Sequence, residues 1–238
     1  MTQKIGITER GDAALHLGWQ EWVQTNGRPA VLITKNPLLL DNFLSGMENI
    51  IVHATITGMG RTIIEPGVIY SKEACKGVVR LVEKFGVKRV ILRCDPVIPT
   101  DQGILTAQGV IEPLRSLFPN MRMKISFMDL YPHVKERFRD AGVLKRIPWG
   151  TFDAPLELKK KAWERLGKPE ICGEKDLPVT GCISETDCNI LGVELDDSIG
   201  KSKQRACCAC IGVKTELLDH PNRCKHGCLY CYWKDKEN

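Results

Sequence analysis

Three closely spaced cysteines near the end of the chain are the residues best suited to do chemistry. Cys224, Cys228 and Cys231 stand in a C-x3-C-x2-C spacing, and Tyr230 directly precedes the third. Thiolates this close together can bind three corners of one soft-metal cluster and leave the fourth corner free. Zinc is the alternative, with His226 as a fourth ligand. His226 lies only two residues from Cys224 and from Cys228, which is cramped for tetrahedral geometry.

The cysteines as a group also point to metal rather than to disulfide bonds. The chain has 11 cysteines, and all but Cys75 and Cys94 lie at residue 172 or beyond. Disulfides rarely persist in a reducing compartment, so this crowding indicates metal or iron–sulfur binding. Cys75 and Cys94 are expected to be small apolar residues of the core.

The composition predicts a globular protein of the cytoplasm. The chain has 238 residues, of which 43% are hydrophobic and 26% charged, enough to bury a full core. No run of 18 apolar residues is present, so we expect no transmembrane helix and no membrane partner. The first residues lack the apolar core of a signal peptide. The net charge of +5 is compatible with a nucleic-acid partner without requiring one.

Upstream of the cysteines, short apolar runs alternate with amphipathic segments. The apolar runs predict six strands, at residues 4–8, 30–34, 50–57, 88–94, 121–128 and 169–172. The segments between them predict helices, at residues 12–23 (capped by Asp12), 38–47, 71–85, 103–117, 131–141 and 153–166. Six β/α units imply a parallel sheet with right-handed crossovers, and an open barrel and a flat doubly wound sheet both fit the count.

After residue 173 the periodic apolar pattern gives way to cysteines, glycines and acidic residues. A region this poor in core residues needs a bound metal to hold a shape. We therefore expect two domains, a (β/α)6 unit over residues 1–173 and a cysteine-rich extension over residues 174–238.

Polar side chains follow nearly every predicted strand. In parallel α/β folds the carboxyl ends of the strands form the rim that carries the site. Asp12 taken alone is better explained as a helix cap, but the joint occurrence favours a site. The residues concerned are Glu9, Arg10, Asp12, Thr34, Lys35, Asn36, Thr55, Thr57, Arg93, Asp95, Asp129, Cys172 and Glu174.

The C-terminal spacing, with its aromatic residue before the third cysteine, resembles the cluster motif of the radical S-adenosylmethionine (SAM) enzymes. Several upstream blocks, taken in order, resemble an uncharacterised bacterial family whose members end in a Tyr-Cys-Tyr run. More distantly, they are similar to spore photoproduct lyase and its radical SAM relatives. The blocks are residues 33–37, 54–58, 64–66, 93–98 and 125–131.

This resemblance implies an open (β/α)6 partial barrel of the radical SAM type. Cys224, Cys228 and Cys231 would hold a [4Fe–4S] cluster whose fourth iron binds SAM, with an electron donor such as flavodoxin or ferredoxin. The same resemblance makes six residues candidates to line the SAM and substrate pocket, Tyr230 at the adenine end: Lys35, Asn36, Glu65, Arg93, Asp95 and Tyr230.

Two departures from the superfamily pattern stand out. The cluster motif is C-terminal here, whereas in most of the superfamily it lies near the N-terminus. The familiar Gly-Gly-Glu after the second strand is replaced by Thr34, Lys35 and Asn36, so the resemblance does not imply how SAM's amino group is held.

A second metal site follows from the resemblance to the uncharacterised family. The matching segments contain four thiols that could hold an auxiliary [4Fe–4S] cluster, with Cys188 and Cys207 as substitutes. A structural zinc tetrathiolate is the alternative for the same ligands. The four are Cys172, Cys182, Cys208 and Cys210.

The resemblance and the basic balance suggest a nucleobase substrate, such as a 5-substituted thymine in DNA of the kind phages hypermodify. A base in a duplex has to be flipped out or presented single-stranded, and Tyr131, Trp149 and Trp233 could stack on it. One alternative is radical SAM chemistry on a free metabolite or peptide. The other is a zinc-stabilised nucleic-acid-binding module without catalysis.

Overall fold

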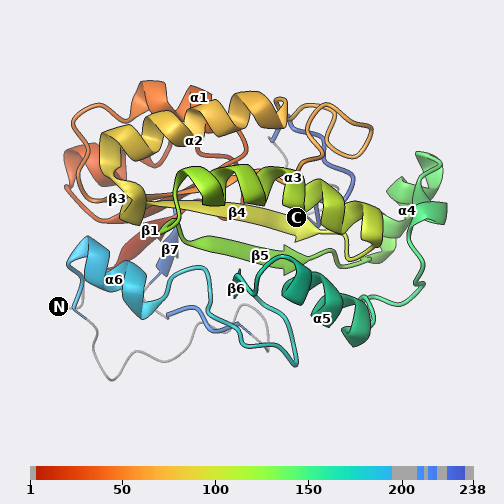
Figure 1. Cartoon of the computed structure of the whole chain (residues 1–238). Helices are drawn as coiled ribbons and strands as arrows, with labels where there is room; N and C mark the ends of the chain where they lie inside the picture. The colour runs from red at the N-terminus through yellow and green to blue at the C-terminus, as the bar shows by residue number, and fades with distance from the viewer. Residues whose placement is uncertain (1–3, 195–207, 212–213, 219–223, 234–238) are drawn as a thin grey trace.

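A computed structural model of the chain describes residues 4–194, 208–211, 214–218 and 224–233. Its centre is a curled, all-parallel, seven-stranded sheet that forms a half-barrel (Figure 1). The strand order is β6-β5-β4-β3-β2-β1-β7. Within the described ranges, no helix has the length and apolar character needed to cross a membrane.

The strand order separates the two architectures that the sequence leaves open. Strands β1 to β6 lie side by side in chain order, so successive crossovers all move in the same direction across the sheet. A doubly wound sheet reverses its order at a switch point and carries helices on both faces. The half-barrel form of the expected fold is therefore confirmed.

All six predicted strands are present. A seventh, which was not predicted, pairs in parallel with β1 at the edge of the sheet. It is only three residues long and lies where the apolar pattern has ended. The strands are β1 (Ile5–Ile7), β2 (Ala30–Thr34), β3 (Ile50–Thr55), β4 (Val90–Val97), β5 (Met123–Phe127), β6 (Glu170–Ile171) and β7 (Lys214–Glu216).

The α-helices mostly follow the predicted segments. Helix α2 ends where expected, because Gly86 adopts a φ of +80° at its C-terminus. Helix α3 continues through Pro113, a residue that usually breaks or kinks a helix. The helices are α1 (Pro37–Leu40), α2 (Ser71–Phe85), α3 (Asp101–Leu117), α4 (Pro132–Asp140), α5 (Leu156–Arg165) and α6 (Glu185–Leu191).

The first predicted helix, over residues 12–23, is wrong. That stretch consists of turns and one π-helical segment, Glu21–Thr25. The Asp12 side chain accepts hydrogen bonds from the Thr34 hydroxyl and the Lys35 backbone N–H, at the end of β2. The Trp19 indole donates to the Ala13 carbonyl at 2.9 Å. Turns held by these side-chain hydrogen bonds take the place of the helix that the apolar spacing predicted.

The two faces of the sheet are covered differently. Side chains alternate along each strand, so Val52 and Leu92 face the outer layer of helices, whereas Ile51 and Ile91 face inward. The inner apolar side chains pack against the cysteine-rich segment, including Ile183. Residues after 173 thus fill part of the half-barrel and add β7 to its edge.

Arg122, just before β5, joins this segment to the sheet. Its guanidinium contacts Glu170 at 2.7 Å and Asp187 at 2.6 Å, and it donates to the Ser184 hydroxyl at 3.2 Å. The Asp187 side chain is fully buried. Burial by itself raises the pKa of both acids, but hydrogen bonds from Arg122 outweigh it and leave each pKa below its usual value.

We predict that Arg122→Ala lowers the free energy of unfolding by about 3 kcal/mol, because Asp187 would remain buried without its cation. The control is Arg139→Ala, since Arg139 pairs with Asp140 on the surface with both side chains more than 60% exposed. Arg139→Ala should lower the free energy of unfolding by less than about 0.5 kcal/mol. Urea denaturation at pH 7 measures both.

The pH dependence supplies a second check on Arg122. A carboxylate whose folded pKa is depressed stabilises the fold above its unfolded pKa, and this contribution disappears as the pH falls through the folded value. The gap between wild type and Arg122→Ala should therefore narrow below about pH 4. Equal losses for the Arg122 and Arg139 variants would contradict the proposed clamp.

Candidate functional site

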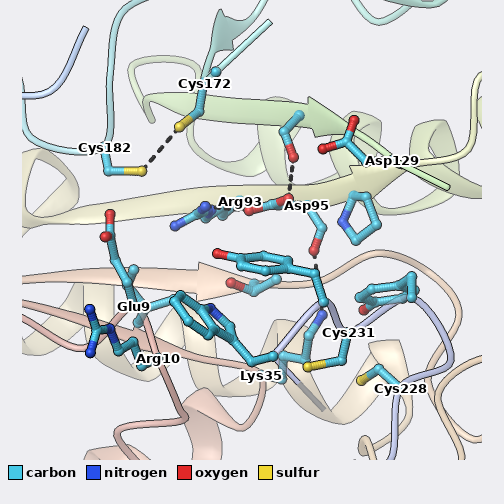
Figure 2. A pocket seen from close by; sticks show the side chains of 18 of the residues that line it. Glu9, Arg10, Lys35, Arg93, Asp95, Asp129, Cys172, Cys182, Cys228 and Cys231 are labelled. Carbon is cyan, nitrogen blue, oxygen red and sulfur yellow. Dashed lines mark hydrogen bonds and ion pairs between the residues drawn. The ribbon is translucent and has the colours of Figure 1, made fainter. Parts of the chain in front are cut away.

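A cavity of about 220 Å³ opens inside the half-barrel at the carboxyl ends of its strands. Polar side chains from the strand ends and thiols from the C-terminal third of the chain share its walls (Figure 2). They include Glu9, Arg10, Asp12, Thr34, Lys35, Thr55, Arg93, Asp95, Ser126, Asp129, Cys172, Cys182, Cys208, Cys210, Cys224, His226, Cys228, Tyr230 and Cys231.

The alternation of strand residues explains why these side chains meet. Ile7, Ile33 and Ile91 face the inside of the half-barrel. Two residues further along the chain stand Glu9 and Lys35, just beyond the ends of β1 and β2, and Arg93 within β4. A period of two keeps each pair on the same face. Along these three segments the inner face is therefore apolar toward the amino end of the strand and polar toward its carboxyl end.

The three cysteines of the C-x3-C-x2-C motif all line this cavity. Gly227 has a φ of +65°, a conformation that residues with a Cβ rarely adopt, and it turns the chain between Cys224 and Cys228. Burial raises the pKa of Cys224 to about 11 and that of Cys228 to about 12. The loop therefore presents three sulfurs to one space, although it lies more than 50 residues after β6, the last of the six predicted strands.

Main-chain contacts hold this loop against the rim. The Arg137 guanidinium, from α4, donates to the Cys231 carbonyl at 2.5 Å and the Cys228 carbonyl at 3.4 Å. The Gly67 N–H donates to the His226 carbonyl at 2.9 Å. A Cβ on Gly67 would lie 2.5 Å from the Lys225 carbonyl oxygen, so only glycine permits this approach.

A buried pair, Asp12 and His226, forms the tightest link between the two ends of the chain. His226 Nε2 lies 2.6 Å from Asp12 Oδ2. Asp12 also accepts hydrogen bonds from the Ala14 N–H, the Thr34 hydroxyl and the Lys35 N–H. Burial would raise the pKa of Asp12, but the contacts with His226 outweigh it and lower that pKa. Asp12 is thus an anchor of the cysteine loop, which corrects its interpretation as a helix cap.

A second buried carboxylate, Glu65, organises the wall beside Tyr230. Lys35 Nζ lies 2.9 Å from Glu65 Oε1, and the Thr57 hydroxyl donates to Oε2 at 2.7 Å. The Tyr230 hydroxyl also donates to Glu65. Burial opposes ionisation of Glu65, but Lys35 and these donors lower its pKa overall. The ammonium of Lys35 stands 5.2 Å from the centre of the Tyr230 ring.

The six residues predicted to contact SAM or substrate are placed differently. Lys35, Arg93, Asp95 and Tyr230 line the cavity. Glu65 is buried behind Lys35 and Tyr230 rather than on the surface of the cavity. Asn36 also lies off the cavity, and its side chain accepts a hydrogen bond from the Leu39 N–H as the N-cap of α1. Arg93 forms an ion pair with Asp95, which accepts a hydrogen bond from Ser126.

The structure also gathers the four cysteines of the second predicted site. The sulfurs of Cys172 and Cys182 lie 3.1 Å apart, and the Cys182 N–H donates to the Cys210 sulfur at 2.9 Å. Hydrogen bonds from Cys172 and Cys182 lower the pKa of Cys210 to about 6. A hydrogen bond from Cys210 likewise lowers the pKa of Cys208 to about 6.

The other cysteines that the structure describes lie outside both groups. Cys188 lies on α6 in the buried inner core, away from the cavity. Cys207, the other substitute ligand, lies outside the described residues. Cys94 is buried in the outer core and Cys75 packs against it, as expected.

Aromatic rings form one side of the cavity. Tyr131 stacks on Tyr232 with ring centres 5.8 Å apart, and Tyr232 contacts Trp233 at 4.9 Å. The Arg10 guanidinium lies over Trp233 at 5.2 Å. Trp149, suggested as a stacking residue, belongs instead to a separate buried core and does not line the cavity.

Sequence reasoning missed two residues that hold the cysteine loop, Arg137 and Gly67. Arg137 contacts carbonyls more than 90 residues away along the chain, and no local pattern distinguishes it from a surface arginine of an amphipathic helix. Gly67 directly follows residues 64–66, a block that the sequence analysis had singled out. Its packing against residue 226 joins distant parts of the chain and leaves no local pattern in the sequence.

The chain matches, over residues 23–233, a family model described as a domain of unknown function, DUF1848. This match spans most of the chain, and the protein therefore belongs to that family. No curated protein and no solved structure matches it.

We predict that Asp12→Asn loosens the cysteine loop, because a charge-assisted hydrogen bond between buried groups is worth about 1.5–3 kcal/mol. Local opening should then be about 10–100 times more frequent, and alkylation of Cys228 in the reduced, metal-free chain should accelerate accordingly. Iodoacetamide labelling at pH 8, read by peptide mass spectrometry, measures this rate. Asp101→Asn is the control, since Asp101 is 69% exposed and lies on the outer helix α3. Identical Cys228 labelling in both variants would refute the anchoring role.

Proposed function

We propose that this protein is a radical SAM enzyme. The observation that carries the proposal is the position of the C-x3-C-x2-C sulfurs. They face a cavity at the carboxyl ends of the strands of a parallel half-barrel, among ionic side chains that could bind a charged cofactor.

The residues present fit a [4Fe–4S] cluster with SAM. The motif formed by Cys224, Cys228 and Cys231 offers three soft donors, which would leave one iron of the cluster available to SAM. The Thr55 hydroxyl oxygen is buried in the cavity wall and has no hydrogen-bond partner among the described residues. A buried polar atom without a partner is costly, and a polar ligand in the cavity would satisfy it.

When bound, the cluster and SAM supply one-electron reductive cleavage of the sulfonium, which yields a 5′-deoxyadenosyl radical able to take hydrogen from a substrate. The chain's own part is to bind, orient and exclude water. Lys35 is held by Glu65, and Arg93 by Asp95, so both cations are fixed in orientation before any ligand arrives. The Tyr230 ring is fixed by the same Glu65 and would pack near the adenine.

For the substrate we favour a nucleobase, with a 5-substituted thymine in DNA as the sharpest hypothesis. The support is the row of rings formed by Tyr131, Tyr232 and Trp233 beside the cavity, with Arg10 over the last of them. Rings of this kind stack on bases, and a cation over the outer ring suits a phosphate backbone. A free metabolite or a peptide remains the alternative substrate, and flavodoxin or ferredoxin the expected type of electron donor.

The cysteines of the second group would hold an auxiliary [4Fe–4S] cluster, with zinc as the alternative. Cys172, Cys182, Cys208 and Cys210 suit both metals, since all four donors are thiols. A zinc-only protein at both groups would correspond to the third hypothesis, a nucleic-acid-binding module without catalysis.

We predict that the anaerobically reconstituted protein is brown and releases 5′-deoxyadenosine from SAM when a reductant is added. Cys228→Ala should lower this release at least a hundredfold, because the motif would lose one of three cluster ligands. Cys75→Ala is the control, since Cys75 lies on α2 outside the cavity, and it should keep wild-type release. A colourless, zinc-loaded protein, or undiminished release from Cys228→Ala, would refute the radical SAM proposal.

We further predict that Tyr131→Leu weakens binding of a thymine-rich single-stranded oligonucleotide by about 1–3 kcal/mol, the usual contribution of one base–aromatic stack. Fluorescence anisotropy at one fixed salt concentration measures this, because phosphate contacts depend on salt. Tyr70→Leu is the matched control, since Tyr70 is 60% exposed and lies outside the cavity. Equal affinities for the two variants would count against a stacked base at this rim.

A further inference from the structure

Glu9 stands beside the second group of cysteines and has no part in the role proposed for the first group. It follows β1, and its side chain reaches the cavity wall next to Cys182 (Figure 2). A carboxylate oxygen of Glu9 and the sulfurs of Cys182 and Cys210 all lie within 4.8 Å of one another. Three donor atoms this close can contact a single metal ion.

The backbone around these sulfurs is arranged for close approach. Gly181 has a φ of +74°, and a Cβ there would lie 2.7 Å from the Ala209 carbonyl carbon. Glycine therefore lets the segments that carry Cys182 and Cys210 lie side by side. The fully buried ammonium of Lys124 donates to the Gly181 carbonyl at 2.5 Å and fixes this segment from the sheet side.

Acidic groups and cations share this point, since Arg93 as well as Lys214 interacts electrostatically with Glu9. Glu9 and the neighbouring thiols are potential anions, and the Glu9 side chain is 11% exposed. Lys214 Nζ lies 3.0 and 2.9 Å from the two Glu9 oxygens. This lysine compensates the carboxylate charge, and a bound cation would compensate both the carboxylate and the thiolates.

We propose that Glu9 is a metal ligand, so that the second metal centre is a mixed carboxylate–thiolate site rather than a purely thiolate one. Lys214 acts as the competing partner that holds the Glu9 carboxylate when no metal is bound. The metal bound by Glu9 would be a thiophilic divalent cation or an iron of the auxiliary cluster. A carboxylate is a harder donor than a thiolate, so it would make this metal position more exchangeable than its all-cysteine counterpart.

The inference rests on the second metal centre proposed above but not on radical chemistry. Zinc alone is therefore a sufficient probe, and no SAM is required. The experiment uses the full chain with Cys224, Cys228 and Cys231 changed to serine, so that one equivalent of Zn²⁺ reaches only the second group. A negative result would leave the 5′-deoxyadenosine assay, and with it the proposed function, unaffected.

Zinc K-edge absorption fine structure gives the direct test. The expected first shell contains an oxygen at about 2.0 Å together with sulfur at about 2.3 Å. Glu9→Gln should remove or lengthen the oxygen contribution. A first shell of sulfur alone, or an oxygen that Glu9→Gln leaves unchanged, overturns the proposal. If Glu9→Gln fails to fold, a first shell of sulfur alone in the parent chain still overturns the proposal.

Zinc affinity, measured by competition with a chromophoric chelator, separates a ligand from an ion-pair partner. Glu9→Gln should weaken binding at least about tenfold, whereas Lys214→Met should leave it unchanged or tighter and Asp129→Asn within about twofold. Asp129 lines the same cavity but is not among the three close donors. Equal losses for Glu9→Gln and Lys214→Met would mean that Glu9 acts only through its ion pair, and would overturn the proposal.

Discussion

The site depends on two buried carboxylates that each need partners from distant parts of the chain. Asp12 takes hydrogen bonds from its own turn, from the end of β2 and from His226. Glu65 takes them from Lys35, Thr57 and Tyr230. Burying a carboxylate is costly unless its oxygens are satisfied. In both cases the final partner belongs to the C-terminal cysteine loop, so docking that loop completes the rim of the half-barrel.

This dependence accounts for how a cysteine motif late in the sequence can line a cavity built by the first strands. The loop closes on the rim through backbone contacts with residues 64 and 67 and through Arg137 from α4. Close approach at Gly67 and the left-handed turn at Gly227 make these contacts sterically possible. The position of the cysteine loop on the rim is thus set by main-chain geometry as well as by charged side chains.

The half-barrel is closed at one end and open at the other. The cysteine-rich segment covers the inner apolar side chains through Ile183 and Leu191, and Arg122 ties it to the sheet. Beyond the cysteine-rich segment, at the carboxyl ends of the strands, the side chains are polar and enclose the cavity. The second group of thiols sits at the boundary, so the same segment supplies both core packing and the thiols of the proposed metal centre.

The sequence by itself determined the six strands, the helix that ends at Gly86 and the grouping of cysteines by spacing. These features are local: strand and helix periods, terminating glycines and short cysteine intervals are visible within a few residues. It also marked the polar strand ends as a rim, because parallel strands present their carboxyl ends at one edge.

Only the tertiary structure decided the singly wound strand order, the added strand β7 and the contacts of Asp12, Arg137 and Glu9. Asp12 meets a partner 214 residues away, and its short-range pattern suggested a helix instead. Lys214 and Glu9 are brought together by the pairing of β7 with β1. Such contacts depend on how the whole sheet curls and packs, and no periodicity in the sequence encodes them.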